Sequence, residues 1–205
     1  LPYDILYKMA KFYTNFHIKR KENQSIASEI YEQCAKALNN IDSVIDFGCG
    51  NGTNLRFFKK QNCDVVGIEC LEYDKQHFLS NPKNLICTDL NKPFNLKKKF
   101  DLALSIELAE HLSPTSSKTF INTLTCHSDF IVFSAAVPNQ GGYKHINENW
   151  QSYWIDLFNQ QGYSCFDIFR YNLWNNQNID FWYKQNLFLF VNDENLYSGT
   201  KKKLM

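Results

Sequence analysis

The sequence predicts an α/β fold built on one mostly parallel β-sheet. From residue 42 onward, short apolar runs alternate with helix-like or turn-rich stretches, a pattern typical of βαβ units with right-handed crossovers. A glycine-rich segment follows the first of these runs. With 205 residues and no internal repeat or linker, the chain is expected to form one domain. We assign a helical cap to residues 1–40, the core to 41–191 and a tail to 192–205.

The first forty residues have a helical pattern. Ile26, Ile30, Cys34 and Leu38 recur at i, i+4 spacing behind Ser25, which is a suitable N-cap. The preceding segment, residues 3–16, is rich in Tyr and Phe. We interpret it as a helix packed on the core, with a lid over a ligand pocket as the alternative.

Seven strands are expected, at residues 43–47, 64–69, 84–89, 101–107, 129–137, 163–170 and 186–191. Ser113 and Pro114 predict the start of one helix, and the apolar spacing from Trp150 to Phe158 predicts another that ends at Gly162. No strong helix separates the last two strands, so we expect them to pair antiparallel.

Composition limits the classes of partner. The formal net charge is +1, which gives no general basic field for nucleic acid. Seven cysteines without Cys-x-x-Cys spacing predict reduced thiols, not disulfides or zinc. The sequence has neither a long apolar segment nor an apolar signal sequence at its start, so we expect a cytoplasmic protein without a membrane partner.

The segment "VIDFGCGNGTNL" predicts a nucleotide-like ligand site. Gly48, Gly50 and Gly52 let the backbone approach a ligand closely at the start of a helix. The third glycine of the dinucleotide pattern is replaced by Thr53, and no Gly-Lys-Ser/Thr follows. Asp46 puts a carboxylate beside the loop, which suits a ligand with an ammonium group better than a pyrophosphate.

Acidic residues end the next strands as well. Glu69 can accept hydrogen bonds from both ribose hydroxyls, and Asp89 is placed to accept from an adenine amino group. Glu107 ends the fourth strand. Together with Asp46 these acids form a series at the edge where open α/β sheets bind ligands.

With these motifs in this order, the chain resembles the class I S-adenosylmethionine-dependent methyltransferases over residues 40–191. The resemblance implies a three-layer Rossmann-like sandwich with a seven-stranded sheet, an antiparallel last strand and a variable N-terminal cap. It also implies S-adenosylmethionine as cofactor. Its implied contacts are Gly48 and Gly50 with the methionine part, Leu90 with the adenine, and Ser105 with the methionine and sulfonium.

The segment "ELAEH" allows a second interpretation. Glu107, Glu110 and His111 have i, i+3, i+4 spacing, which could align them as metal ligands on a helix. The segment does not match the usual zinc motifs, and the methyltransferase resemblance already accounts for it. We therefore expect no metal, and we expect His111 to touch the cofactor or support its pocket.

The methyl acceptor is expected at "AAVPNQGGYKHINENW". His145 is the candidate general base for a neutral hydroxyl, because a loop after the fifth strand should lie beside the methyl group. An anionic acceptor would instead need donors, for which Lys144, Arg170, Lys184 or a protonated His145 are available. Tyr143 and Trp150 complete the expected substrate contacts.

The pattern from this loop to "WYKQNLFLF" is similar to small-molecule methyltransferases of bacterial capsule and polysaccharide biosynthesis. The resemblance implies oxygen acceptors such as sugar hydroxyls or a phosphoramidate group. A protein or RNA methyltransferase and a non-catalytic cofactor-binding protein are the alternatives. The oligomeric state is left open.

Overall fold

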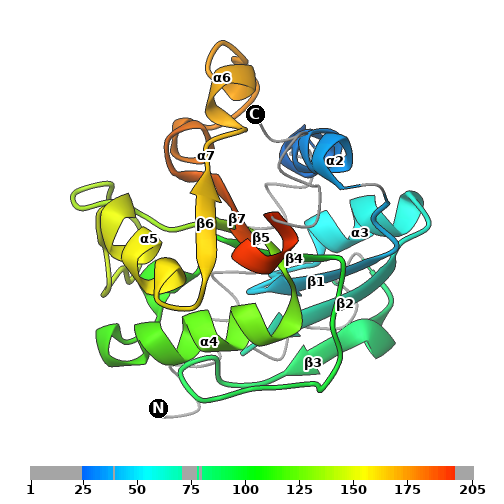
Figure 1. Ribbon diagram of the computed structural model, residues 1–205, viewed down its shortest axis with the longest axis horizontal. Coiled ribbons are helices and arrows are strands. Elements are labelled where there is room, and N and C mark those ends of the chain that lie inside the picture. Colours follow the sequence, from blue (N-terminus) through cyan, green and yellow to red (C-terminus); the bar gives the residue numbers. More distant parts are fainter. Residues whose placement is uncertain (1–24, 39, 71–77, 79, 197–205) are drawn as a thin grey trace.

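The fold of the chain is given by a computed structural model, which describes residues 25–38, 40–70, 78 and 80–196. A seven-stranded sheet forms its centre (Figure 1). The strands are β1 (Ser43–Phe47), β2 (Asp64–Glu69), β3 (Leu85–Cys87), β4 (Leu102–Ile106), β5 (Phe130–Ser134), β6 (Tyr163–Phe166) and β7 (Phe188–Asn192). Each of the seven predicted strands is present, with its ends shifted by up to a few residues.

The strand order is β3-β2-β1-β4-β5-β7-β6. Strands β1 to β5 pair in parallel, and β7 runs antiparallel to both β5 and β6. The predicted antiparallel pairing of the last two strands and the Rossmann-like sheet are therefore confirmed. The chain builds the sheet outward from β1 to β3 and then returns to the other side of β1 to form β4. The carboxyl ends of β1 and β4 therefore lie side by side, at the point where the strand order switches.

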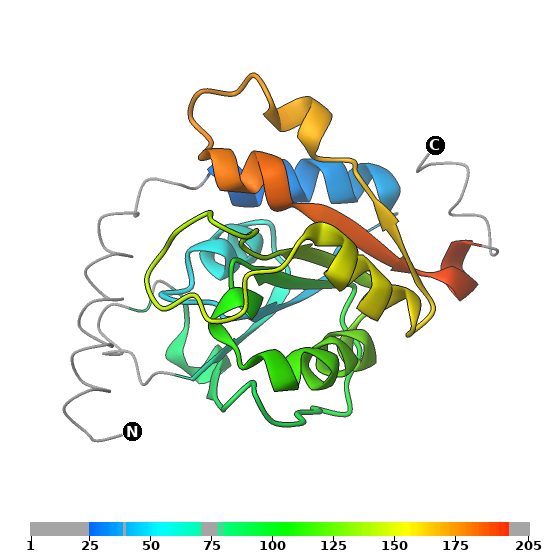
Figure 2. The same ribbon diagram turned by 90° about the vertical axis from the view of Figure 1, so that its left-hand side faces the viewer.

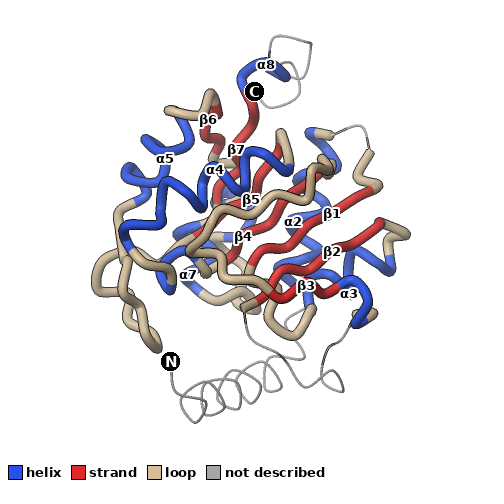
Figure 3. The backbone as a smooth tube through the Cα atoms, turned by 90° about the horizontal axis from the view of Figure 1, so that it is seen from below, coloured by secondary structure: helices blue, strands red, loops and turns tan. Residues whose placement is uncertain are grey.

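Helices cover both faces of the sheet, as Figures 1 and 2 show. The main ones are α2 (Ser25–Ala37), α3 (Thr53–Lys60), α4 (Ser117–His127), α5 (Gln151–Asn159), α6 (Arg170–Leu173), α7 (Phe181–Asn186) and α8 (Asp193–Asn195). Short 3₁₀ turns are formed by Pro82–Asn84, Ala109–His111 and Pro114–Ser116. Helices α4 and α5 lie on one face, and α2, α3, α6 and α7 on the other (Figure 3).

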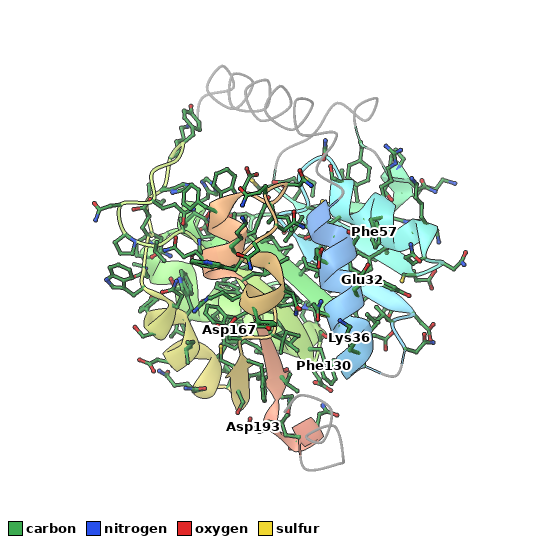
Figure 4. All side chains as sticks on the ribbon, turned by 90° about the horizontal axis from the view of Figure 1, so that it is seen from above. Glu32, Lys36, Phe57, Phe130, Asp167 and Asp193 are labelled. Atoms are coloured by element: carbon green, nitrogen blue, oxygen red, sulfur yellow. The ribbon has the colours of Figure 1, made fainter. Side chains whose placement is uncertain are left out.

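Successive side chains of a strand point to opposite faces of the sheet, so the apolar residues form two cores, one on each face. In β1, Val44 belongs to the core beneath α2 and α3, and Ile45 belongs to the core beneath α4 and α5. On α2 the buried Ile30 faces the sheet, and the exposed Glu32 and Lys36 lie on its outer side (Figure 4). This is the three-layer arrangement that buried parallel strands require.

Several local predictions can be compared with the structure. Ser113 and Pro114 begin the 3₁₀ turn that leads into α4, and Gly162, at φ 74°, follows α5. Between β6 and β7, where no strong helix was predicted, the chain forms the two short helices α6 and α7. Strand β7 and α8 also extend structure into the predicted tail.

The aromatic segment 3–16 lies outside the described residues. Among the residues that are described, none of the helices combines the length and apolar character that a membrane crossing requires.

Candidate active site

The strand order brings the four predicted acids to one edge of the sheet. Asp46 lies near the end of β1, Glu69 ends β2, Asp89 follows β3 and Glu107 follows β4. Because β3, β2, β1 and β4 are consecutive in the sheet, these acids are arranged in the spatial order Asp89, Glu69, Asp46, Glu107. The predicted series of acids at the carboxyl edge is therefore present.

The glycine loop has the left-handed backbone that only glycine adopts without strain. Gly48, Gly50 and Gly52 have φ angles of 73°, 54° and 81°. The loop is tied to β2, because Gly50 N–H donates to Oε2 of Glu69 over 3.1 Å and Cys70 N–H donates to Oε1 over 2.8 Å. Glu69 thus holds the glycine loop against β2.

Asp46 is a buried acid beneath this loop, with 1% of its surface exposed. Burial, together with the nearby Glu69, raises its pKa to about 8 against the opposing effect of a hydrogen bond from Asn54. A buried carboxyl group of this kind becomes a stronger partner for a cationic ligand group than for an anion. This agrees with the expectation of an ammonium-bearing ligand.

Asp89 and Leu90 occupy the turn after β3. Asp89 is exposed, and Oδ1 accepts hydrogen bonds from the backbone and side-chain N–H groups of Asn91, both at 3.0 Å. These bonds lower the pKa of Asp89, so it is a carboxylate at neutral pH. The Leu90 side chain is buried in the core beneath α4 and α5.

At the end of β4, Ser105 is fully buried, and its Oγ has no hydrogen-bond partner among the described residues. Glu107 follows with φ 49°, and its carboxylate accepts from Gln140 Nε2 over 2.8 Å and from Asn186 Nδ2 over 3.3 Å. Asn186 also donates to Gln140 Oε1 over 2.7 Å. Sequence reasoning missed Gln140 and Asn186, and the only available signal was the position of Gln140 in the loop after β5.

The 3₁₀ turn after β4 carries Glu110 and His111. Glu110 is fully buried, and neither carboxylate oxygen has a hydrogen-bond partner of normal geometry among the described residues. Burial and the nearby Glu107 raise its pKa well above the usual range, although the backbone N–H groups of Glu110 and Ala136 partly oppose this. Burial, together with the nearby His145, lowers the pKa of His111 to about 4.

The loop after β5 is fastened onto this turn by its backbone. The N–H groups of Ile146 and Asn147 donate to the carbonyl oxygen of Glu110 over 2.9 and 3.1 Å. Asn147 Nδ2 also donates to Ala109 O and to Ser117 Oγ. These bonds place the preceding residue, His145, over the turn that carries Glu110 and His111.

His145 lies among three ionisable side chains. Its Nδ1 is 2.9 Å from Oε1 of Glu148, and its Nε2 is 4.0 Å from Oε1 of Glu110. Its ring meets that of His111 edge to face, with centroids 4.9 Å apart. A Cβ atom at Gly142 would come within 2.2 Å of the imidazole, so this glycine leaves the space that His145 occupies.

The turn after β4, over which His145 lies, begins beside the glycine loop. A Cβ atom at Gly48 would lie 2.7 Å from the side chain of Leu108, which is part of the "ELAEH" segment. A carboxylate bonded to Nδ1 favours the tautomer in which Nε2 has no proton. The arrangement can therefore accept a proton or bind a cation beside the predicted cofactor loop.

The residues predicted to bind the methyl acceptor do not form one cluster. Tyr143 and Lys144 are exposed on the His145 loop, with the Lys144 ammonium 5.5 Å from the centre of the Tyr143 ring. Trp150 is 59% exposed where α5 begins. Arg170 contacts Asp167, the carbonyl of Gln185 and the ring of Phe188, none of which belongs to the cluster around His145. Lys184 donates to the carbonyl of Trp174.

Comparison with known proteins identifies the class. The sequence model of a family described as "Methyltransferase domain" matches residues 18–178. The match spans most of the chain, so this protein belongs to that methyltransferase family. A search of curated protein sequences gave no match.

Solved structures share the fold at low sequence identity. DesVI from Streptomyces venezuelae has a TM-score of 0.65 at 15% identity, over 93% of this chain and 98% of its own. CalS10 from Micromonospora echinaspora, an amino pentose methyltransferase solved with S-adenosylmethionine, has a TM-score of 0.64 at 14% identity, over 87% and 96%. The plantazolicin methyltransferase BpumL, solved with S-adenosylhomocysteine and a desmethyl analogue, has a TM-score of 0.59 at 19% identity, over 89% and 90%.

Proposed function

We propose that this protein transfers the methyl group of S-adenosylmethionine to an oxygen atom of a small-molecule acceptor. The observation that carries the proposal is the His145–Glu148 pair, which lies over the turn after β4, the strand that pairs with β1 and precedes that turn. Membership of the methyltransferase family supplies the reaction class.

The residues at the edge of the sheet fit this cofactor. S-adenosylmethionine supplies a methyl group on a sulfonium centre, together with an ammonium group and a ribose. Asp46 offers a buried carboxyl group to a cation, Glu69 offers a carboxylate at the end of β2 to ribose hydroxyls, and the buried Ser105 Oγ lacks a partner among the described residues. Two of the similar structures, CalS10 and BpumL, contain S-adenosylmethionine or its product.

His145 is the residue that activates the acceptor. Its Nε2 takes the proton of an acceptor hydroxyl, while Glu148 holds the ring by Nδ1. The exposed Tyr143, Lys144 and Trp150 surround the outer side of the same loop and offer aromatic and cationic contacts. Arg170 is a more distant candidate for binding an anionic acceptor.

The acceptor class follows from the resemblance to capsule and polysaccharide methyltransferases, which favours a sugar hydroxyl or a phosphoramidate oxygen. CalS10 and BpumL are named for an amino pentose and for plantazolicin, which supports a small-molecule acceptor. The net charge of +1 also favours this over a nucleic acid.

Two measurements test the proposal. Calorimetry with S-adenosylhomocysteine should show binding, and absence of binding would refute the cofactor. A screen of capsule precursors, including phosphorylated and phosphoramidate compounds, should reveal methyl transfer. Tight product binding without transfer to any acceptor would favour a non-catalytic cofactor-binding protein.

The local test is His145→Ala. We expect kcat to fall well beyond tenfold with unchanged affinity for S-adenosylhomocysteine. If only KM for the acceptor rises, His145 binds the substrate and does not activate it.

A further inference from the structure

We propose that Glu110, His111 and His145 form a binding site for one divalent transition-metal ion, with Mn²⁺ and Zn²⁺ as the candidates. One ligand atom from each of these residues lies within 4.8 Å of the other two. The proposal departs from the expectation, drawn from the sequence, that the site holds no metal. The role of the ion, but not the site itself, rests on the proposed function.

Glu110 is the strongest support for a ligand. Its side chain is 1% exposed, and neither carboxylate oxygen has a hydrogen-bond partner of normal geometry among the described residues. Leaving a buried carboxylate unpaired is costly, and such groups in native proteins are paired or coordinate a metal. Since Oε1 faces Nε2 of His145 over 4.0 Å, the unsatisfied group points toward the other two ligands.

Each of the two histidines has a hydrogen-bond partner that can fix the orientation of its ring. A metal-binding imidazole usually donates its other ring N–H to a carboxylate or a carbonyl group. His145 has Glu148 at Nδ1, over 2.9 Å, and His111 is hydrogen-bonded to the backbone of Lys144. Glu148 is itself fixed by the backbone N–H of Asn139 over 2.9 Å.

The spacing is close to that of an occupied site. With metal–ligand bonds of about 2.1 Å, ligand atoms of a tetrahedral ion are about 3.4 Å apart. The distance from Glu110 to His145 is 4.0 Å and all three ligand atoms lie within 4.8 Å of one another, so they must approach by at most about 1.4 Å.

The ligand types favour a transition metal. The two imidazoles suit Zn²⁺, the carboxylate of Glu110 also suits Mn²⁺, and Mg²⁺ and Ca²⁺ prefer sites made of oxygen ligands alone. Three protein ligands leave coordination positions open, and these can take an oxygen of the acceptor. With an ion bound, Nε2 of His145 would be a ligand in place of the general base. The ion would lower the pKa of a coordinated acceptor hydroxyl, whose proton would pass to solvent water.

Metal binding to the full chain tests the site without reference to activity. The protein is prepared without a polyhistidine tag, stripped with EDTA and titrated with Mn²⁺ under electron paramagnetic resonance. Mn²⁺ is the main probe because the exposed thiols of Cys70 and Cys87 offer Zn²⁺ other ligands. We expect one Mn²⁺ per chain, competed by Zn²⁺, with much weaker competition by Mg²⁺.

The variants are Glu110→Gln, which keeps the size of the side chain, and His145→Gln in the loop. Each should weaken Mn²⁺ binding at least tenfold, while Glu32→Gln on the outer side of α2 should leave it unchanged. Circular dichroism monitors folding. Equal Mn²⁺ affinity in the wild type and both folded variants, or no Mn²⁺ binding at all, would overturn the proposal.

Failure of the metal site and failure of the proposed function give different results. A protein that binds S-adenosylhomocysteine and methylates an acceptor after EDTA treatment, without binding Mn²⁺, would refute only the metal. A protein that binds Mn²⁺ through Glu110 and His145 but not S-adenosylhomocysteine would refute the proposed function and leave the metal site in place.

Discussion

Oε1 of Glu148 lies 2.9 Å from Nδ1 of His145, three residues earlier in the same loop. The hydrogen bond lowers the pKa of Glu148, so the carboxylate is charged at neutral pH. The second oxygen of Glu148 accepts from the backbone N–H of Asn139 over 2.9 Å. One side chain therefore fixes the loop and sets the orientation of the imidazole.

This relationship predicts the effect of changing Glu148. Glu148→Gln should reduce methyl transfer by about 10- to 100-fold, because the imidazole loses the charge that orients it. Glu148→Ala should reduce it further, since the bond to Asn139 is also lost. Affinity for S-adenosylhomocysteine, measured by calorimetry, should stay the same. Glu32→Gln is the control, and wild-type rates in both Glu148 variants would show that the pair has no role.

Gly142 and Gly141 provide a matched pair that tests the position of the imidazole. Both have positive φ angles, 150° and 74°, so alanine strains the backbone at either position. A Cβ atom at Gly142 would lie 2.2 Å from His145, whereas one at Gly141 would meet nothing within 4 Å. Gly142→Ala should therefore reduce kcat at least tenfold, and Gly141→Ala should change stability slightly and kcat little. Equal kinetic effects would mean that backbone strain alone is responsible.

Glu69 should control cofactor affinity. It accepts hydrogen bonds from the backbone of Gly50 and Cys70, so it shapes the glycine loop, and we expect its carboxylate to bind the ribose hydroxyls as well. Hydrogen bonds to a charged group contribute about 1.5–3 kcal/mol, so Glu69→Gln should weaken S-adenosylhomocysteine binding about 10- to 100-fold. The control is Asp64→Asn, an exposed acid at the start of the same strand. Unchanged affinity for the Glu69 variant would remove this residue from the cofactor site.

The sequence predicts the sheet well because local patterns specify it. Strands and turns are recognised from short stretches of consecutive residues, namely apolar runs of strand length and the turn-forming residues between them. The glycine loop is recognised because only glycine easily adopts the φ angles that it needs. The short helices α6 and α7 were not predicted, since their stability depends on packing under β7 more than on their own sequence.

The candidate site was predicted only in part, for a physical reason. Glu110 and His145 are 35 positions apart, and they meet because Ile146 and Asn147 bond to the carbonyl of Glu110. Gln140 and Asn186 meet Glu107 through similar non-local contacts. Backbone bonds of this kind leave no periodic signal in the sequence, so the cluster becomes visible only in the fold.

His127, which received no role from the sequence, is a structural residue with a pH-dependent effect. It is fully buried between Phe94 and Phe47, its Nε2 accepts from Leu96 N–H over 2.9 Å, and its Nδ1 is 2.7 Å from the carbonyl of Thr123. Nδ1–H therefore donates to Thr123, and Nε2 must lack a proton. Burial lowers the pKa of His127 below its usual value.

Acidification should therefore reduce the stability of the folded chain through His127. In the unfolded chain the His127 imidazole is protonated as the pH falls below about 6.5. In the folded chain it stays neutral until the pH falls to its lowered pKa. The stabilisation is complete above about pH 6.5 and is lost as the pH falls toward the folded pKa, by at most about 1.4 kcal/mol per pH unit. His127→Gln removes the ionisable group, so the free energy of unfolding of the wild type minus that of the variant should shrink over this range. Taking the difference cancels the titration of other groups, including Asp46. A constant difference between pH 7.5 and pH 5, from urea unfolding of both proteins, would show that His127 is not held neutral by the fold.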